Sequence, residues 1–313
     1  MPVHRTATLN KFDKIEILTT MQNTLASSRS YRGCVFMLLA MAAFSIEDMF
    51  IKSASQVVPL GFTVLLFGLG GSFIFYCLMK HKAEAVFPPE MRSRTMLVRT
   101  FCEIIGRSFF ALAIVMMPLS SASAILQATP LVVVLGASLF LKEKIPVTHW
   151  IAILIGFIGV IMIVRPGLDD FDFASLFAVV STLGFAGRDL ATRVASPRLS
   201  NAQLGFYGFL VLIAAGCCLS LTTDKPFSIN FDSGLQIIGA ILFGVIAYHS
   251  LTVAMRSGSI SVVAPFRYSR VIFAMILGII IFDERPDILT ICGILVIVMS
   301  GLYLLLNKRR AAN

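Results

Sequence analysis

Charged residues inside apolar stretches are the feature of this sequence that could carry chemistry. Arg267 and Arg270 lie three residues apart within the apolar stretch 259–282, which also contains Pro265. Arginine at membrane depth is costly unless it faces protein or water, so it marks a functional site. Pro265 removes a backbone donor, which favours a helix bent around a cavity. The pattern predicts a solute-binding or gating role for the two arginines.

Two aromatic residues, Phe266 and Tyr268, flank Arg267 in this stretch. Together with Arg267 they could stack on an aromatic ring and hydrogen-bond to it. The alternative is structural, because buried arginine seldom goes unpaired. In that case Asp189 or Glu103 would be the partner.

A second group of charges lies in the stretch 95–117. Arg99, Glu103 and Arg107 are spaced i, i+4, i+8, which places them on one face of a helix. Arg107 lies about 18 Å from the start of that stretch and cannot easily reach either membrane surface. Either this face lines a cavity, with Arg107 holding a polar group of the substrate, or it is a self-compensating ladder in which Glu103 neutralises both arginines.

Two further acids have a basic residue close by. Asp48 precedes Lys52 by four residues near the end of the first apolar stretch, and Arg188 directly precedes Asp189 in a later one. Each is interpreted in two ways, as a local ion pair or as a functional group. In the functional interpretation, Asp48 is a candidate acid for coupling transport to protons.

Neutral polar residues add hydrogen-bonding groups. Gln127 lies in an otherwise apolar stretch and is expected to face a cavity, with helix packing as the alternative. Tyr248 and His249 lie deep in the stretch 234–255. They are interpreted either as a substrate or proton site or as satisfied buried donors.

The balance of these charges bears on the substrate. Five cations meet four anions inside the apolar stretches: Arg99, Arg107, Arg188, Arg267 and Arg270 against Glu47, Asp48, Glu103 and Asp189. This balance favours a neutral or anionic substrate over a cation. No hydrolase, metalloprotease or phosphate-binding motif is present, and the six cysteines lack metal-ligand spacing, so we predict no enzyme, metal or cofactor.

The composition defines the class of protein. Of 313 residues, 57% are hydrophobic and 14% charged, and the mean hydropathy is +0.88, which indicates an integral membrane protein. The net charge of +9 does not indicate nucleic-acid binding, because the basic residues lie in short loops between apolar stretches. The expected partners are the lipid bilayer and a small-molecule solute, and no oligomeric state is predicted.

Ten stretches are long and apolar enough to cross the bilayer as helices, and barrel strands would be shorter. They are 33–51, 58–79, 95–117, 120–141, 147–164, 173–192, 203–222, 234–255, 259–282 and 287–307. With the amino terminus in the cytoplasm, seventeen lysines and arginines lie in the inside segments and four in the outside loops. This bias predicts that both termini are cytoplasmic.

The chain is also predicted to contain an internal repeat. Glu284 corresponds to Glu143 at an offset of 284 − 143 = 141 residues, and the same offset places Gly293 over Ala152. Five helices per repeat is an odd number, so the second repeat must be inverted, which is typical of secondary transporters. The predicted segments are an amino-terminal tail with an alternative start at Met21, two repeats and a basic tail, at 1–31, 32–165, 172–307 and 308–313.

Four groups of residues carry a family resemblance: Glu143 with Pro146, Glu284 with Pro286, Asp48 with Lys52, and Arg165-Pro166-Gly167. In these groups the sequence resembles the EamA family of the drug/metabolite transporter superfamily, in its ten-helix form. The segments Ala264-Pro265-Phe266-Arg267-Tyr268-Ser269-Arg270 and Asp283-Glu284-Arg285-Pro286 are similar to a bacterial subgroup that includes riboflavin importers and S-adenosylmethionine carriers.

The resemblance implies a secondary transporter of the bacterial inner membrane that works by alternating access. Riboflavin uptake is the first hypothesis for its activity. The alternatives are export of amino acids or other metabolites, or S-adenosylmethionine transport, which the charge balance disfavours. A membrane-embedded enzyme or a receptor is the hypothesis from a different functional class. Against the enzyme, the sequence shows no catalytic group of residues, and against the receptor, the short loops predict no soluble domain.

Overall fold

The structure is a computed structural model that describes residues 11–140, 142, 147–165, 172–194, 199–221, 226–257 and 264–310. All regular secondary structure in these ranges is helical. Glu143, Pro146, Pro166 and Gly167, which belong to the family-like motifs, lie outside the described residues. The predicted all-helical class is therefore confirmed for the part of the chain that can be described.

The first repeat contains six α-helices and one short 3₁₀ helix. They are α1 (Lys11–Ala54), α2 (Leu60–His81), η1 (Pro89–Arg92), α3 (Arg94–Met116), α4 (Leu119–Leu126), α5 (Thr129–Phe140) and α6 (Val147–Val164). Helix α1 includes part of the predicted amino-terminal tail, because it begins at Lys11.

The second repeat follows the same order. It comprises α7 (Ala174–Val194), α8 (Asn201–Ser220), α9 (Phe231–Arg256), η2 (Ala264–Tyr268), α11 (Ser269–Phe282) and α12 (Ile288–Arg310). Two helix starts match the predicted offset residue for residue, since 60 + 141 = 201 for α2 and α8 and 147 + 141 = 288 for α6 and α12. The offset read from the sequence therefore relates elements of the folded chain.

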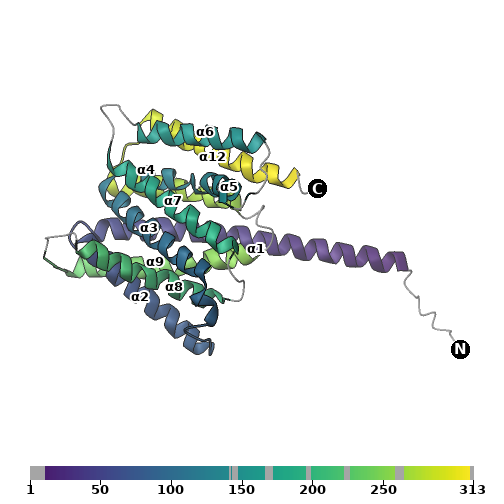
Figure 1. Ribbon diagram of the computed structural model, residues 1–313, viewed down its shortest axis with the longest axis horizontal. Helices are drawn as coiled ribbons and strands as arrows, with labels where there is room; N and C mark the ends of the chain where they lie inside the picture. The colour runs from purple at the N-terminus through teal and green to yellow at the C-terminus, as the bar shows by residue number, and fades with distance from the viewer. Residues whose placement is uncertain are drawn as a thin grey trace.

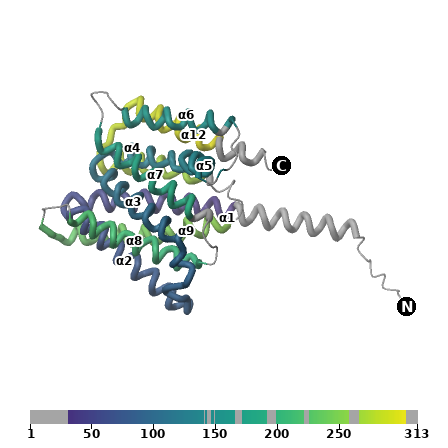
Figure 2. Tube along the Cα trace, in the orientation of Figure 1, coloured from purple at the N-terminus to yellow at the C-terminus, as the bar shows by residue number. Residues whose placement is uncertain are grey.

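The main helix pairs all join one repeat to the other. Helix α2 packs on α8, α1 on α9, α3 on α7 and α6 on α12. In Figure 1 the α6 and α12 pair forms one edge of the molecule, α2 and α8 lie towards the opposite edge, and the remaining helices lie between them. The repeats are therefore interleaved, as the trace in Figure 2 also shows, and the largest cluster of buried hydrophobic side chains takes residues from both.

Glycines permit the closest of these approaches. A Cβ atom on Gly184 of α7 would lie 2.6 Å from the backbone nitrogen of Gly106 on α3. A Cβ atom on Gly159 of α6 would lie 2.9 Å from the carbonyl oxygen of Gly293 on α12. Small residues let helix backbones approach in a membrane, where packing rather than water drives association. These contacts hold the two repeats together.

The fourth predicted helix is interrupted at Gln127 and Ala128. The prediction of one continuous helix over 120–141 differs from the structure, in which α4 ends at Leu126 and α5 begins at Thr129. The reason is Pro130, which has no N–H to donate to the Leu126 carbonyl. The Thr129 hydroxyl donates to that carbonyl instead, at 2.5 Å.

The ninth predicted helix changes at the corresponding place. The 3₁₀ helix η2 ends at Tyr268 and α11 begins at Ser269. Tyr268 corresponds to Gln127, since 127 + 141 = 268. Both repeats therefore depart from a regular α-helix at corresponding residues. Irregular backbone in a membrane is tolerated where it faces protein or a cavity.

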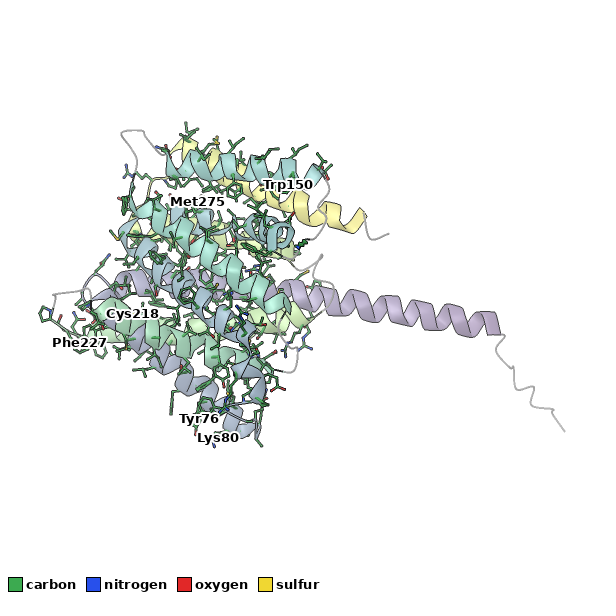
Figure 3. The ribbon with its side chains drawn as sticks, viewed as in Figure 1. Tyr76, Lys80, Trp150, Cys218, Phe227 and Met275 are labelled. Atoms are coloured by element: carbon green, nitrogen blue, oxygen red, sulfur yellow. The ribbon has the colours of Figure 1, made fainter. Side chains whose placement is uncertain are left out.

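Within the described ranges, five segments meet the length and hydropathy expected of a membrane span. They are Tyr31–Ala54, Leu60–His81, Leu119–Phe140, Asn201–Ser220 and Phe231–Arg256, and shorter apolar helices cover Trp150–Val164 and Ile288–Tyr303. Helix α3 instead carries two buried ionisable residues, Arg99 and Glu103. At one end of α2, Lys80 lies beside Tyr76, with its Nζ 5.7 Å from the ring centre (Figure 3).

Candidate substrate site

A cavity of about 50 Å³ lies where the two repeats meet. Residues from both repeats line it: Met41, Phe44, Arg107, Phe110, Leu126, Gln127, Thr129, Pro130, Phe185, Arg188, Leu251, Arg267 and Arg270. We call it the arginine cavity after Arg107, Arg188, Arg267 and Arg270. Its volume holds about three or four water molecules. Sites for drug-sized ligands occupy roughly 300–1,000 Å³, so the helices must move apart to admit a metabolite.

The two interrupted helices meet at this cavity. The Gln127 side-chain amide donates to the carbonyl of Arg267 at 2.6 Å, joining the interruption between α4 and α5 to η2. This contact fixes the backbone that carries Arg267. Gln127 is itself part of the lining.

Four ion pairs form a continuous chain beside the cavity. Glu103 is fully buried between Arg99, at 3.3 Å, and Arg188, at 3.6 Å. Arg188 is also paired with Asp189 at 2.8 Å, and Asp189 lies 3.9 Å from Arg267. Arg188 and Arg267 line the cavity, whereas the other three members of this chain, Arg99, Glu103 and Asp189, do not.

Two further arginines of the lining each face one acid of α1. Arg107 lies 3.5 Å from Glu47 and Arg270 lies 2.7 Å from Asp48. Within α3, Glu103 therefore pairs with Arg99 but not with Arg107, so the expected ladder of both arginines on Glu103 is not formed. Nor does Asp48 pair with Lys52, four residues further along the chain.

Lys52 belongs to a separate group of charges at the end of α1. Its ammonium donates to Glu284 at 3.1 Å and to the carbonyl of Met117 at 2.9 Å. Glu284 also accepts hydrogen bonds from the backbone amides of Leu119 and Ser120 and from the Ser120 hydroxyl. The carboxylate thus caps the positive amino-terminal end of α4. We call this group, Lys52, Met117, Leu119, Ser120 and Glu284, the Lys52 cluster.

Aromatic rings surround the arginines of the cavity. The Arg270 guanidinium carbon lies 5.0 Å from the Phe44 ring centre and 5.2 Å from that of Phe110. The Arg188 guanidinium carbon lies 4.7 Å from the Phe185 ring. Such contacts support a cation where water is scarce. Sequence reasoning missed these rings, although the repeat pointed to two of them, since 44 + 141 = 185.

Four of the eight predicted substrate-binding residues do not line the cavity. The Tyr248 side chain is buried, and its hydroxyl accepts a hydrogen bond from Arg99 at 3.5 Å. His249 is exposed on the helix surface rather than deep in the protein, because consecutive helical residues point about 100° apart. Phe266 is 37% exposed and Tyr268 is buried against Gly301, so these rings do not form the expected stacking site with Arg267.

Metal ligands are not gathered in the described ranges. No group of three His, Cys, Asp or Glu side chains there is placed to hold a metal ion. The six cysteines are free thiols.

Comparison with known proteins places this arrangement in a family. The chain matches relatives named the pseudopaline exporter CntI of Pseudomonas aeruginosa, at 28% identity over 88% of this chain and 97% of the relative, and a riboflavin transporter of Vibrio cholerae, at 28% identity over 66% and 70%. A solved crystal structure shares the fold with a TM-score of 0.58 at 16% identity, covering 90% of this chain and 99% of that one.

The family assignment rests on the two repeats. The model of the EamA-like transporter family matches residues 31–165 and, separately, residues 172–306. These two matches together span most of the 313 residues. The chain therefore belongs to the EamA-like transporter family.

Proposed function

We propose that this chain is a secondary transporter that moves a small organic solute across the bacterial inner membrane by alternating access. The observation that carries the proposal is the arginine cavity, a polar site lined by residues of both repeats. Alternating access rocks one repeat against the other around a site at their junction. Every main helix pair joins the two repeats, so relative movement of the repeats would reshape this cavity.

The membrane arrangement belongs to the same proposal. Ten helices cross the bilayer, with both termini in the cytoplasm and the Lys52 cluster at the outer side. Seventeen lysines and arginines in the inside segments against four in the outside loops support this orientation. Reporter fusions after Asn313 and after Ser228 test this orientation. A periplasmic reporter should be active after Ser228 and inactive after Asn313, and activity at both positions would contradict the proposal.

Riboflavin is the first solute to test. The motifs around Arg267 resemble those of riboflavin importers, and one relative carries the name riboflavin transporter. The test uses a riboflavin auxotroph lacking its own importer, grown at limiting riboflavin with this chain expressed. Rescue by the native chain but not by Arg267→Ala is the expected result.

The matched control is Arg285→Ala, which removes an arginine that is 87% exposed and outside the cavity. It should rescue as well as the native chain. Failure of the native chain at full membrane expression would remove riboflavin from the proposal. Rescue by Arg267→Ala would instead separate riboflavin transport from the arginine cavity.

A second candidate is export of an acidic metabolite. One relative, matched over most of both chains, is named an exporter. Four arginines line the cavity, and none of the lining residues within the described ranges is acidic. This surface disfavours S-adenosylmethionine, whose sulfonium centre is a cation. Efflux from cells preloaded with labelled amino acids or dicarboxylates tests this candidate, with Arg267→Ala abolishing the efflux.

Asp48 is the proposed coupling acid. Its partner, Arg270, lines the cavity, whereas Asp48 itself is 2% exposed. A solute that reaches Arg270 would compete with Asp48 for the guanidinium. Released from that pair, Asp48 could take up a proton, which would link solute binding to proton movement.

A further inference from the structure

We propose that the arginine cavity is an anion site, in which Arg267 binds a carboxylate or phosphate group of the transported solute. This inference rests on the proposed transport function and deepens it by naming the substrate class. It departs from riboflavin, which carries no formal charge at neutral pH. Three features of the described residues support it: the charge of the lining, the exposure of Arg267 and the unused donors of two neighbouring arginines.

The charges that face the cavity are all positive. Arg107 and Arg270 are each paired with one acid of α1, Glu47 and Asp48. Arg188 and Arg267 are paired with Glu103 and Asp189. None of these four acids belongs to the lining, and no described lining residue is acidic. A surface at membrane depth that presents only cations favours an anion.

Arg267 has the most exposed side chain of the four arginines that line the cavity. Its side chain is 28% exposed, compared with 15% for Arg188 and 13% for Arg270. Its contact with Asp189 is 3.9 Å long, beyond hydrogen-bond distance. Arg267 ends the chain of ion pairs and lines the cavity, so an entering anion can pair with it without breaking a strong contact.

Two neighbouring guanidinium groups of the lining have unused donors. The Nε atoms of Arg107 and Arg270 are buried without a hydrogen-bond partner. Carboxylate oxygens of Glu47 and Glu103 also lack a hydrogen-bond partner, but neither acid lines the cavity. A carboxylate or phosphate in the cavity would therefore meet several arginines and no acid of the lining.

The test uses the full chain in detergent and a pair of probes that share one ring system. Riboflavin and riboflavin 5′-phosphate differ by a phosphate, and citrate and inorganic phosphate supply anions without the ring. Thermal unfolding is followed at constant ionic strength while each probe is titrated. We expect citrate and riboflavin 5′-phosphate to raise the unfolding midpoint in a saturable way, with riboflavin producing a smaller rise.

Variants assign the response to the cavity. Losing a hydrogen bond to a charged group weakens binding about 10- to 100-fold, so Arg267→Gln should weaken the apparent affinity for citrate by that factor. Arg267→Lys keeps the charge and should keep part of the anion-dependent rise in the unfolding midpoint. This variant distinguishes a loss of anion binding from a folding defect. Arg285→Gln removes an exposed arginine and should match the native chain.

The outcomes separate this inference from the proposed function. A native chain that responds to riboflavin but to none of the three anions overturns the anion site and leaves transport intact. Equal anion responses in Arg267→Gln and the native chain also overturn it. If the anion response depends on Arg267 but reconstituted vesicles move no solute, the anion site stands and the proposed transport fails.

Discussion

The Lys52 cluster and the arginine cavity both bury charge, but they treat it differently. In the Lys52 cluster, the Glu284 carboxylate meets one ammonium and three hydrogen-bond donors, and Lys52 also donates to a carbonyl. In the arginine cavity, cations outnumber anions and two guanidinium nitrogens lack a hydrogen-bond partner. Complete pairing suits a contact that holds helices together, whereas an excess of donors suits a site that receives a ligand.

The largest expected effect comes from breaking the Lys52 cluster. Glu284→Ala leaves Lys52, whose side chain is 13% exposed, without its acid and removes the cap of α4. Removing one partner of a buried ion pair costs about 3–5 kcal/mol, so the free energy of unfolding should fall by that amount. Chemical unfolding of the full chain in detergent measures it.

The control for this prediction is the neighbouring acid. Asp283 is 88% exposed, so Asp283→Ala should change the free energy of unfolding by no more than about 0.5 kcal/mol. Adding Lys52→Met to Glu284→Ala should recover part of the loss, since the unpaired ammonium is then gone. If Glu284→Ala lowers the free energy of unfolding no more than Asp283→Ala does, the Lys52 cluster does not stabilise the fold.

Within the cavity, the Arg107 and Glu47 pair offers a sharper comparison. Arg107→Gln leaves the Glu47 carboxylate buried at 1% exposure without a cation, and should cost about 3 kcal/mol of unfolding free energy. The double variant Arg107→Gln/Glu47→Gln should recover most of that stability but not solute binding. Recovery of both would show that Arg107 serves the fold rather than the site.

The Asp48 and Arg270 pair tests coupling. Asp48→Asn keeps an acceptor for Arg270 but removes the titratable group. Uptake driven by an imposed pH gradient in membrane vesicles should fall about tenfold, equal to roughly 1.4 kcal/mol. Exchange of labelled for unlabelled solute without a gradient should continue. Asp48→Asn vesicles that keep full gradient-driven uptake would exclude Asp48 as the coupling acid.

The smallest expected effect concerns positioning. Gln127→Ala removes the hydrogen bond to the Arg267 carbonyl, a contact of about 1 kcal/mol, and should weaken the anion response about fivefold. The control is Ser121→Ala, which changes a polar residue of α4 that does not line the cavity. Anion titrations of the two variants, followed by the same thermal unfolding, measure the difference. Identical responses would remove Gln127 from the positioning of Arg267.

Much of the fold could be predicted because membrane helices depend on length and hydropathy. The positions of α2, α6, α8 and α12 follow from the apolar stretches, and the offset of 141 residues relates their starts. The interruption between α4 and α5 was not predicted. A helix that loses one backbone bond at Pro130 keeps the same apolar composition, so hydropathy cannot reveal the change.

The partners of the charges were harder to predict. The spacing of Asp48 and Lys52 places both on one helix face, but Lys52 pairs with Glu284, which lies 232 residues away in the sequence. Spacing within one helix does not tell which side chain another helix presents. The arginines of the cavity were identified because their cost in a membrane marks them, whereas the rings of Phe44 and Phe185 look like ordinary apolar residues.

The most direct test of the anion site is an experimental structure of the full chain with bound selenate. Selenate is an anion whose position anomalous scattering reveals. We predict an anomalous peak in the arginine cavity, within hydrogen-bonding reach of the Arg267 guanidinium, that is lost in Arg267→Gln. Peaks confined to surface lysines and arginines, with the cavity empty of the anion, would contradict the anion site.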